Sequence, residues 1–453
     1  MKSSILIRKR YRAIFDLLLL YISKSGAIVV GVFALPWYQK LLGASDFGLV
    51  ALILALQAFF LMMDLGTSTL VGRELAAEKS FSPPRCTLRA GELVLHLFYI
   101  FLMLLALLLN RILNFNFPSI QIILGTIFFW ALSVQNIGQS ALMARRKYHL
   151  AAVSQIVGVL SRAFITILVL SFFFANFESF LFVQSVVAVF QMFLTLHFCN
   201  KVVNKDDFEY SINEFVPVVG NILRRGAPLV AFGLAGAAVM QMDKVIIGVW
   251  GDTKAVAAYY LASTLCLVPI SVLAGPVAQY FQPKIISNLT ARDFDSFERN
   301  LKLMIMALML AVVIPSLLLW INRELIVNIW LRGQSNTDEV IHYVKLLLPG
   351  VAIGSFGFVS YVILIAYQDY KAQAIISAAM TIMTLGVTAY FAKNNNVEAI
   401  CIVYVIYHIL SAFAGWLRAC FLQTQNGYKT FLYRDGILFF LVVVILMLIL
   451  MNN

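Results

Sequence analysis

Apolar runs of about 20 residues recur along this chain, and this recurrence constrains the fold more than any other feature. A helix of that length crosses a hydrocarbon core of about 30 Å. Because 61% of the residues are hydrophobic and only 12% are charged, the chain is too apolar for a water-soluble globule. The runs are also too long for the strands of a β-barrel. The sequence therefore predicts an all-α integral membrane protein.

Twelve transmembrane helices are predicted, and residues 436–451 form a thirteenth candidate, so 12 to 13 helices are expected. The spans lie near residues 13–38, 47–72, 90–110, 119–143, 151–174, 178–199, 227–250, 257–282, 302–321, 341–367, 372–391 and 397–421. A basic, polar segment divides them into equal halves. The predicted domains are an N-terminal six-helix lobe at 1–199, a cytoplasmic linker at 200–225, a C-terminal six-helix lobe at 226–421 and a C-terminal segment at 422–453.

The two halves begin with similar hairpins. The first hairpin, Ser23 to Glu74, consists of two apolar spans separated by a polar break, and Gly226 to Ile285 repeats this plan. Two lobes with an even number of spans each would be parallel repeats, related by an axis along the membrane normal. The sequence thus predicts a pseudo-symmetric pair of lobes.

The orientation in the membrane follows from the loops, because short loops that are translocated to the far side of the membrane contain few Lys and Arg residues. If the N-terminus is cytoplasmic, the cytoplasmic loops hold about four times as many basic residues as the opposite loops. This bias also accounts for most of the net charge of +12, so no nucleic-acid partner is required.

Sequence motifs of enzymes are absent. The chain has no GxxxxGK[ST], HExxH or CxxC pattern, and its five histidines are scattered. The five cysteines fall in spans or at cytoplasmic ends, which argues against a disulfide framework. We therefore expect a protein that is not an enzyme and that uses no cofactor or metal.

Charged side chains inside the spans are the most informative signal, because a charge facing lipid costs several kcal/mol. Lys24 and Arg162 each lie about twelve residues into their spans and are expected near the midplane. Few acids share that depth, so a cavity that binds phosphate or diphosphate is predicted. The alternative is a buried ion pair that fixes helix register, such as Lys24 with Asp64.

Further polar positions extend the predicted substrate site. Arg73 is expected at its cytoplasmic mouth, and Asp243 and Lys244 lie within the seventh span. Asp64 or Asp243 could couple the cycle to a proton or a sodium ion, and the sequence does not select between them. Amides of the fourth span either join helices or bind sugar hydroxyls; they are Gln135, Asn136 and Gln139.

Two patterns carry a resemblance to a known family. The stretch LLGASDFGLVALILALQAFFLMMDLGTSTLVGRELA and the later MDKVIIGVWGDTKAVAAYYLAS resemble the bacterial polysaccharide-lipid flippases. The similarity is greatest to the O-antigen flippases of the multidrug/oligosaccharidyl-lipid/polysaccharide exporter superfamily. The positions that match the family pattern are Asp64, Gly66, Arg73, Glu74 and Asp243.

This resemblance implies a V-shaped, alternating-access transporter in the bacterial inner membrane. Its cargo would be undecaprenyl-diphosphate-linked O-antigen units, moved from the cytoplasmic to the periplasmic leaflet for lipopolysaccharide or other surface polysaccharide synthesis. The implied partners are this lipid-linked oligosaccharide, the membrane lipids, a coupling H⁺ or Na⁺ and a polysaccharide polymerase. Two alternatives stay open: a multidrug exporter of the same superfamily, and a membrane-embedded polymerase or ligase.

Overall fold

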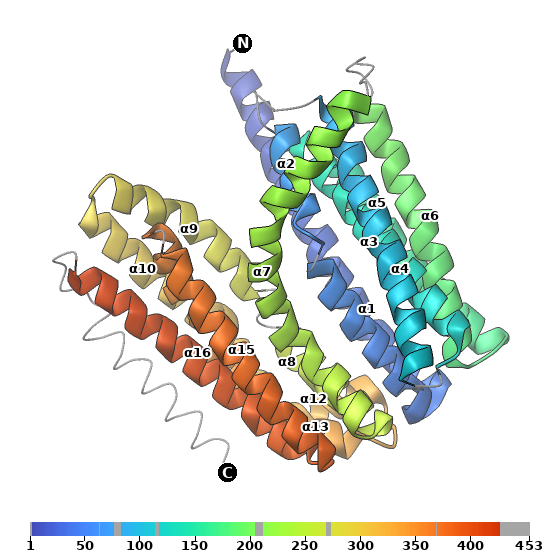
Figure 1. Ribbon diagram of the computed structural model, residues 1–453. Coiled ribbons are helices and arrows are strands. Elements are labelled where there is room, and N and C mark those ends of the chain that lie inside the picture. Colours follow the sequence, from blue (N-terminus) through green and yellow to red (C-terminus); the bar gives the residue numbers. More distant parts are fainter. Residues whose placement is uncertain are drawn as a thin grey trace. The chain divides into compact units, whose positions relative to one another are not determined.

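The structure is a computed structural model in which the described residues form helices and no strands (Figure 1). Those residues are 2–62, 64–76, 83–113, 117–145, 147–203, 212–268, 273–367 and 369–425. Nine helices in this part of the chain are long and apolar enough to cross a membrane, which confirms the predicted all-α membrane fold. The thirteenth candidate span, 436–451, lies outside the described residues.

The chain folds into two compact units, Met1–Ala237 and Ala238–Asn453. The division falls inside helix α7 (Ile212–Trp250), and α7 includes residues 212–225 of the segment predicted as a linker. Val218 and Ile222 of α7 pack against Leu70 and Cys86. The first part of α7 is therefore a packed element of unit 1.

Unit 1 contains six helices before α7. They are α1 (Lys2–Met62), α2 (Thr67–Ala76), α3 (Pro84–Ile112), α4 (Ser119–Ala144), α5 (Tyr148–Phe172) and α6 (Phe177–Val203). The first helix is two helices that meet at Gly43, whose φ of 76° and ψ of 171° are not helical. Glycine adopts a positive φ without the steric cost of a Cβ, so the predicted break between the first two spans is present.

The predicted second span, 47–72, is not one continuous helix. Leu65 and Gly66 have positive φ angles of 56° and 67°, and they separate the end of α1 from the start of α2. The prediction failed here because hydropathy averaged over a whole span does not register an interruption as short as DLGT at 64–67. The break places the carboxylate of Asp64 at the beginning of α2.

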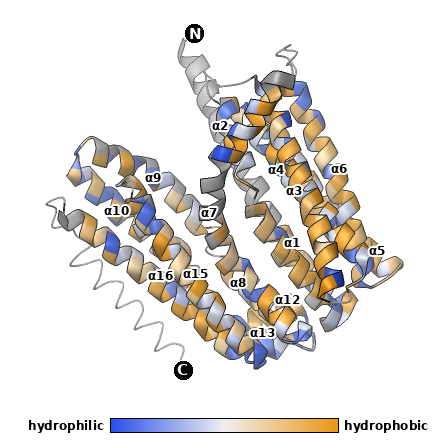
Figure 2. Ribbon diagram, in the orientation of Figure 1, coloured by the Kyte–Doolittle hydropathy of each residue, from blue (hydrophilic) through white to orange (hydrophobic). Residues whose placement is uncertain are grey.

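The core of unit 1 is built around α4, which packs against α2, α3 and α6. Phe128, Leu132 and Ile137 of α4 are buried together with Leu95 of α3. Hydrophobic residues run along most of α3 and α4 (Figure 2). The helices are thus apolar toward their neighbours and toward the lipid, as expected of a membrane bundle.

Unit 2 contains the second part of α7 and the remaining helices. They are α8 (Thr253–Val268), α9 (Gly275–Thr290), α10 (Phe294–Leu308), the π-helical turn η2 (Met309–Val313), α11 (Ile314–Ile321), α12 (Arg323–Leu331), α13 (Thr337–Gly354), α14 (Gly357–Ala366), α15 (Tyr370–Lys393) and α16 (Val397–Gln425).

The predicted tenth span, 341–367, is also divided, because α13 ends before α14 begins. At this division the indole Nε1 of Trp416 donates a hydrogen bond to the carbonyl oxygen of Phe356 at 3.0 Å. Both residues are 1% exposed and belong to the hydrophobic core of unit 2. The same carbonyl oxygen also accepts from the Val359 backbone N–H at 3.0 Å, so the indole is a second donor to it and links α16 to the division.

Candidate functional site

Arg162 of α5 lies at a contact between α1, α5 and α6 in unit 1. Its guanidinium interacts electrostatically with the side chain of Tyr38. The hydroxyl of buried Tyr38 forms hydrogen bonds with Thr166 and Gln184, and Gln184 Nε2 donates to Thr166 Oγ1 at 3.0 Å. We call these four residues the Arg162 cluster.

The Nε atom of Arg162 is buried and has no hydrogen-bond partner among the described residues. A guanidinium carries five N–H donors and no acceptor. Leaving a buried donor unpaired costs free energy, and Arg162 also forms no ion pair with a described carboxylate. The cluster therefore retains an unpaired N–H group, and an oxyanion can accept a hydrogen bond from it.

The two other cations predicted for unit 1 have side chains outside the described part of the structure. Lys24 belongs to α1 and Arg73 to α2 by their backbones. Lys24 precedes Tyr38 by about 14 residues, which is roughly 21 Å along a helix. Lys24 and the Arg162 cluster thus lie at different heights along α1, and the sequence did not reveal this separation.

Asp64 accepts hydrogen bonds from the start of α2. Its Oδ1 accepts from the Gly66 backbone N–H at 2.9 Å, and its Oδ2 accepts from the Ser68 backbone N–H at 3.2 Å and from the Ser68 hydroxyl. Asn136 Nδ2 of α4 lies 3.5 Å from the same Oδ2. Asp64 is therefore an N-terminal cap of α2, and it lies beside one of the predicted amides.

The other two amides connect α4 to α5. Gln135 Nε2 donates to Gln155 Oε1 at 3.1 Å, and Gln139 Nε2 donates to Ser154 Oγ at 2.6 Å. These contacts correspond to the helix-joining alternative. Binding of sugar hydroxyls by the same side chains stays a prediction.

Asp243 and Lys244 form a buried ion pair in unit 2, with each residue 2% exposed. The Lys244 Nζ lies 3.0 Å from Asp243 Oδ1 and donates to the Met240 carbonyl oxygen at 2.6 Å. The hydroxyl of Tyr259 on α8 donates to Asp243 Oδ2 at 2.7 Å. A residue of a second helix thus donates a hydrogen bond to the carboxylate of this ion pair.

Sequence reasoning missed several residues of these sites, among them Tyr38 and His408. Tyr38 supplies the hydroxyl of the Arg162 cluster, and buried His408 of α16 interacts electrostatically with Lys244. The Nε2 of His408 has no hydrogen-bond partner in the described part of the chain. Neither residue belongs to a recognisable motif, and only the helix packing connects it to its partners.

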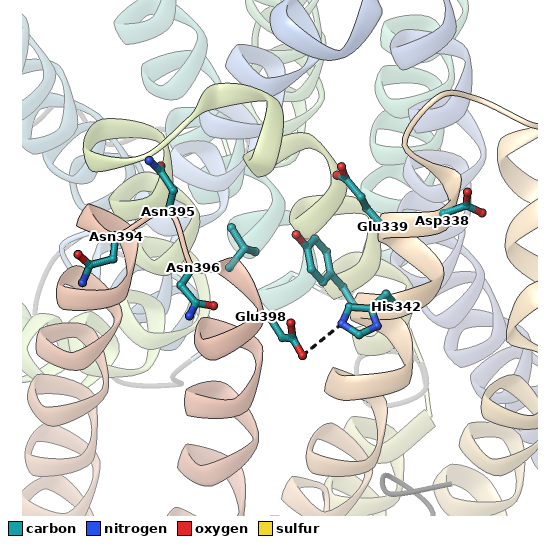
Figure 3. A pocket seen from close by; sticks show the side chains of 9 residues that line it. Asp338, Glu339, His342, Asn394, Asn395, Asn396 and Glu398 are labelled. Carbon is teal, nitrogen blue, oxygen red and sulfur yellow. Dashed lines mark ion pairs between the residues drawn. The ribbon is translucent and has the colours of Figure 1, made fainter.

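A polar cavity of about 600 Å³ lies over the ends of α13, α15 and α16 in unit 2 (Figure 3). His342 Nε2 of α13 and Glu398 Oε1 of α16 face each other across it at 3.5 Å. Its lining residues are mostly carboxylates and amides: Asp338, Glu339, His342, Tyr343, Asn394, Asn395, Asn396, Val397 and Glu398. No group of metal-ligating side chains occurs among the described residues.

Comparisons with known proteins agree with this architecture. A family model described as "Polysaccharide biosynthesis protein" matches residues 16–289. No curated protein sequence is significantly similar to the chain.

Several solved structures have a similar fold. One is the inward-facing conformation of a multidrug resistance MATE family transporter of the MOP superfamily, with a TM-score of 0.70 and 14% identity over 91% of this chain and 98% of that chain. Another is the lipid II flippase MurJ in an inward closed conformation, with a TM-score of 0.69 and 13% identity over 96% of this chain and 97% of that chain. A third is a MOP superfamily transporter from Pyrococcus furiosus, described for the reverse polarity of its binding pocket, with a TM-score of 0.60 and 14% identity over 91% of this chain and 96% of that chain.

Proposed function

Because this chain belongs to the polysaccharide biosynthesis protein family, we propose that it is a flippase for undecaprenyl-diphosphate-linked O-antigen units. It would move them from the cytoplasmic to the periplasmic leaflet of the bacterial inner membrane, with its N-terminus in the cytoplasm. The similar folds are those of transporters and a flippase, which supports transport in preference to catalysis. The translocated units would then pass to a polysaccharide polymerase.

The observation that carries this proposal is the unpaired donor of Arg162. A cation within a membrane bundle normally faces a partner or a water-filled path, and no described carboxylate pairs with Arg162. A diphosphate supplies the oxygen acceptors that the guanidinium fork prefers. We therefore propose that the part of the substrate that contacts α5 is anionic.

Lys24 and Arg162 would act in succession, because they are separated along α1. Lys24, helped by Arg73, would attract the diphosphate in the cytoplasmic half of unit 1. Arg162 would receive it about 21 Å further along α1. Alternating access then requires only that the substrate binds one state more tightly than the other.

The sugar chain has a separate candidate contact in the cavity over α13. Carboxylate oxygens accept hydrogen bonds from hydroxyl groups, and each amide side chain both donates and accepts. Asp338 and Glu398 offer such acceptors to a polyhydroxylated chain. Replacing both with their amides should lower transport partially, whereas Asp295→Asn at the first turn of α10 should leave it unchanged.

Ion coupling forms part of the proposal. Asp64 and Asp243 are the two carboxylates proposed to bind a proton or a sodium ion. Each already accepts hydrogen bonds within the protein, so an incoming ion would have to compete with those donors.

The test replaces the cations and measures surface polysaccharide. Arg162→Ala, Lys24→Ala and the double variant are expressed in a bacterium that lacks its own O-antigen flippase. We expect the double variant to abolish surface polysaccharide while the protein still inserts in the membrane. Lys302→Ala is the matched control, because Lys302 lies in a half-exposed ion pair with Glu298 of its own helix. Near-normal polysaccharide from the double variant would contradict the proposal.

The competing function is export of cationic drugs. A cavity for such substrates should be acidic. The positive charge of Arg162, which has no carboxylate partner among the described residues, opposes the binding of a cation. A dye-efflux assay in a strain without other exporters separates the two functions. Efflux that depends on Arg162 would favour the drug exporter.

A further inference from the structure

Three oxygen atoms surround the ammonium group of Lys244. The Nζ atom lies 3.0 Å from Asp243 Oδ1, 3.1 Å from Asp243 Oδ2 and 2.6 Å from the Met240 carbonyl oxygen. A carboxylate combined with a backbone carbonyl is also the donor set of hard metal cations. The ammonium group therefore occupies a position that a small monovalent cation could fill.

The surroundings hold the carboxylate of this oxygen cage in place. Tyr259 donates to Asp243 Oδ2 at 2.7 Å, and the ring of Tyr259 lies 5.8 Å from the Lys244 Nζ. The hydroxyl of Tyr404 on α16 donates to the sulfur of Met240 at 3.1 Å. Three helices, α7, α8 and α16, thus meet at the cage.

Because the Asp243 side chain is buried, its negative charge needs a positive partner. Both charged side chains are 3% exposed, and an ionised carboxylate without compensation is costly in such a place. If the partner came from solution, its binding would depend on the cation concentration. Because Lys244 is covalently attached, the positive charge is present at all times.

We propose that Lys244 is a tethered cation that fills a monovalent-cation site made by Asp243 and the Met240 carbonyl. Removing the Lys244 side chain opens this site to Na⁺ or K⁺ from solution. The consequence for coupling rests on the proposed flippase function and narrows the ion coupling proposed above: external Na⁺ is excluded at Asp243, so Asp243 could bind only a proton and a coupling sodium ion is left to Asp64. The tethered charge instead keeps α7 and α8 joined in the absence of any alkali ion.

The experiment measures thermal unfolding of the purified full-length protein in detergent. Unfolding is followed in NaCl, KCl and N-methyl-D-glucamine chloride at equal ionic strength. A ligand that binds only the folded state raises the unfolding midpoint with its concentration. We expect the wild-type midpoint to be the same in all three salts, and the midpoint of Lys244→Ala to rise by several degrees in Na⁺ or K⁺.

The matched control is the double variant Asp243→Asn with Lys244→Ala, which lacks the anionic ligand and should lose the cation-specific rise. Two results would overturn the proposal: a Na⁺-dependent rise in the wild type that Asp243→Asn removes, or a Lys244→Ala protein that does not respond to either alkali ion. Where Lys244→Ala does not fold, the wild-type comparison decides alone. No transport is measured, so the outcome is independent of the polysaccharide assay.

Discussion

Asp64 shows how one side chain receives different roles from sequence and structure. The sequence marks it as a counter-ion or a coupling site, whereas the structure uses both of its oxygens to cap α2. Asp64→Ala should lower the free energy of unfolding by about 0.5–2 kcal/mol. Asp64→Asn keeps an acceptor and should cost less.

Thermal or denaturant unfolding of the purified variants checks this prediction. An Asp64→Ala protein as stable as the wild type would contradict the capping role. If Asp64→Asn retains stability and loses transport, the charge of the carboxylate matters beyond capping, and ion coupling at Asp64 gains support.

Some of these residue-level contacts were predictable and others were not. In the sequence Asp-Leu-Gly-Thr-Ser, an acceptor side chain precedes a helix start in the manner of an N-terminal cap, so the role of Asp64 is visible in hindsight. The contact of Asp243 with Lys244 is not predicted by their adjacency, because neighbouring side chains on a helix do not face each other. The contacts of Tyr259 with Asp243 and of Tyr38 with the Arg162 cluster need the packing of helices that are distant in the chain, and one sequence contains no such information.

At the scale of elements, helix positions were predicted well and helix interruptions poorly. Each predicted span from the first to the twelfth coincides with one or more helices of the structure. The divisions after α1 and after α13 were missed, because each interrupts the apolar span for only a few residues, DLGTS at 64–68 and GSFG at 354–357, and a hydropathy average over about 20 residues hides them. Hydropathy reports the length of chain within the membrane, whereas an interruption depends on single φ angles and on buried donors such as Trp416.

The contact between α13 and α16 offers a test of close helix packing. A Cβ added at Gly350 would lie 2.7 Å from the Cα atom of Val405 and 2.8 Å from its Cβ. Because backbone must move, Gly350→Ala should destabilise the protein by about 1–3 kcal/mol. Gly386→Ala in α15 is the control, because a Cβ there meets nothing within 4 Å, and it should stabilise by about 0.4–1 kcal/mol.

Unfolding midpoints of the two glycine variants, compared with that of the wild type, check this prediction. Equal midpoints for Gly350→Ala and Gly386→Ala would show that α13 and α16 are not closely packed at Gly350.

For the whole molecule, the sequence was sufficient to predict a polytopic helical bundle, because hydropathy is a property of the entire chain. The relative depths of the charged side chains were beyond it, since they depend on where helices cross. Lys24 and Arg162 illustrate this. Each lies about twelve residues into its predicted span. Arg162 nevertheless interacts with α1 at Tyr38, which is roughly 21 Å along the helix from Lys24.

The orientation of the molecule rests on the distribution of basic loops and can be tested directly. The basic segment around α10 should face the cytoplasm, and the cavity over α13 should face the periplasm. The five cysteines are buried and free, so replacing them with alanine yields a background for single-cysteine labelling. Ser335→Cys and Asp295→Cys introduce one exposed thiol near each end.

A maleimide that does not cross membranes is applied to spheroplasts before and after permeabilisation. Cys at 335 should react in intact spheroplasts, whereas Cys at 295 should react only after permeabilisation. The reverse pattern would place the cavity over α13 in the cytoplasm. Because a sugar chain leaves a flippase on the periplasmic side, that result would also remove the argument that this cavity contacts the translocated sugars.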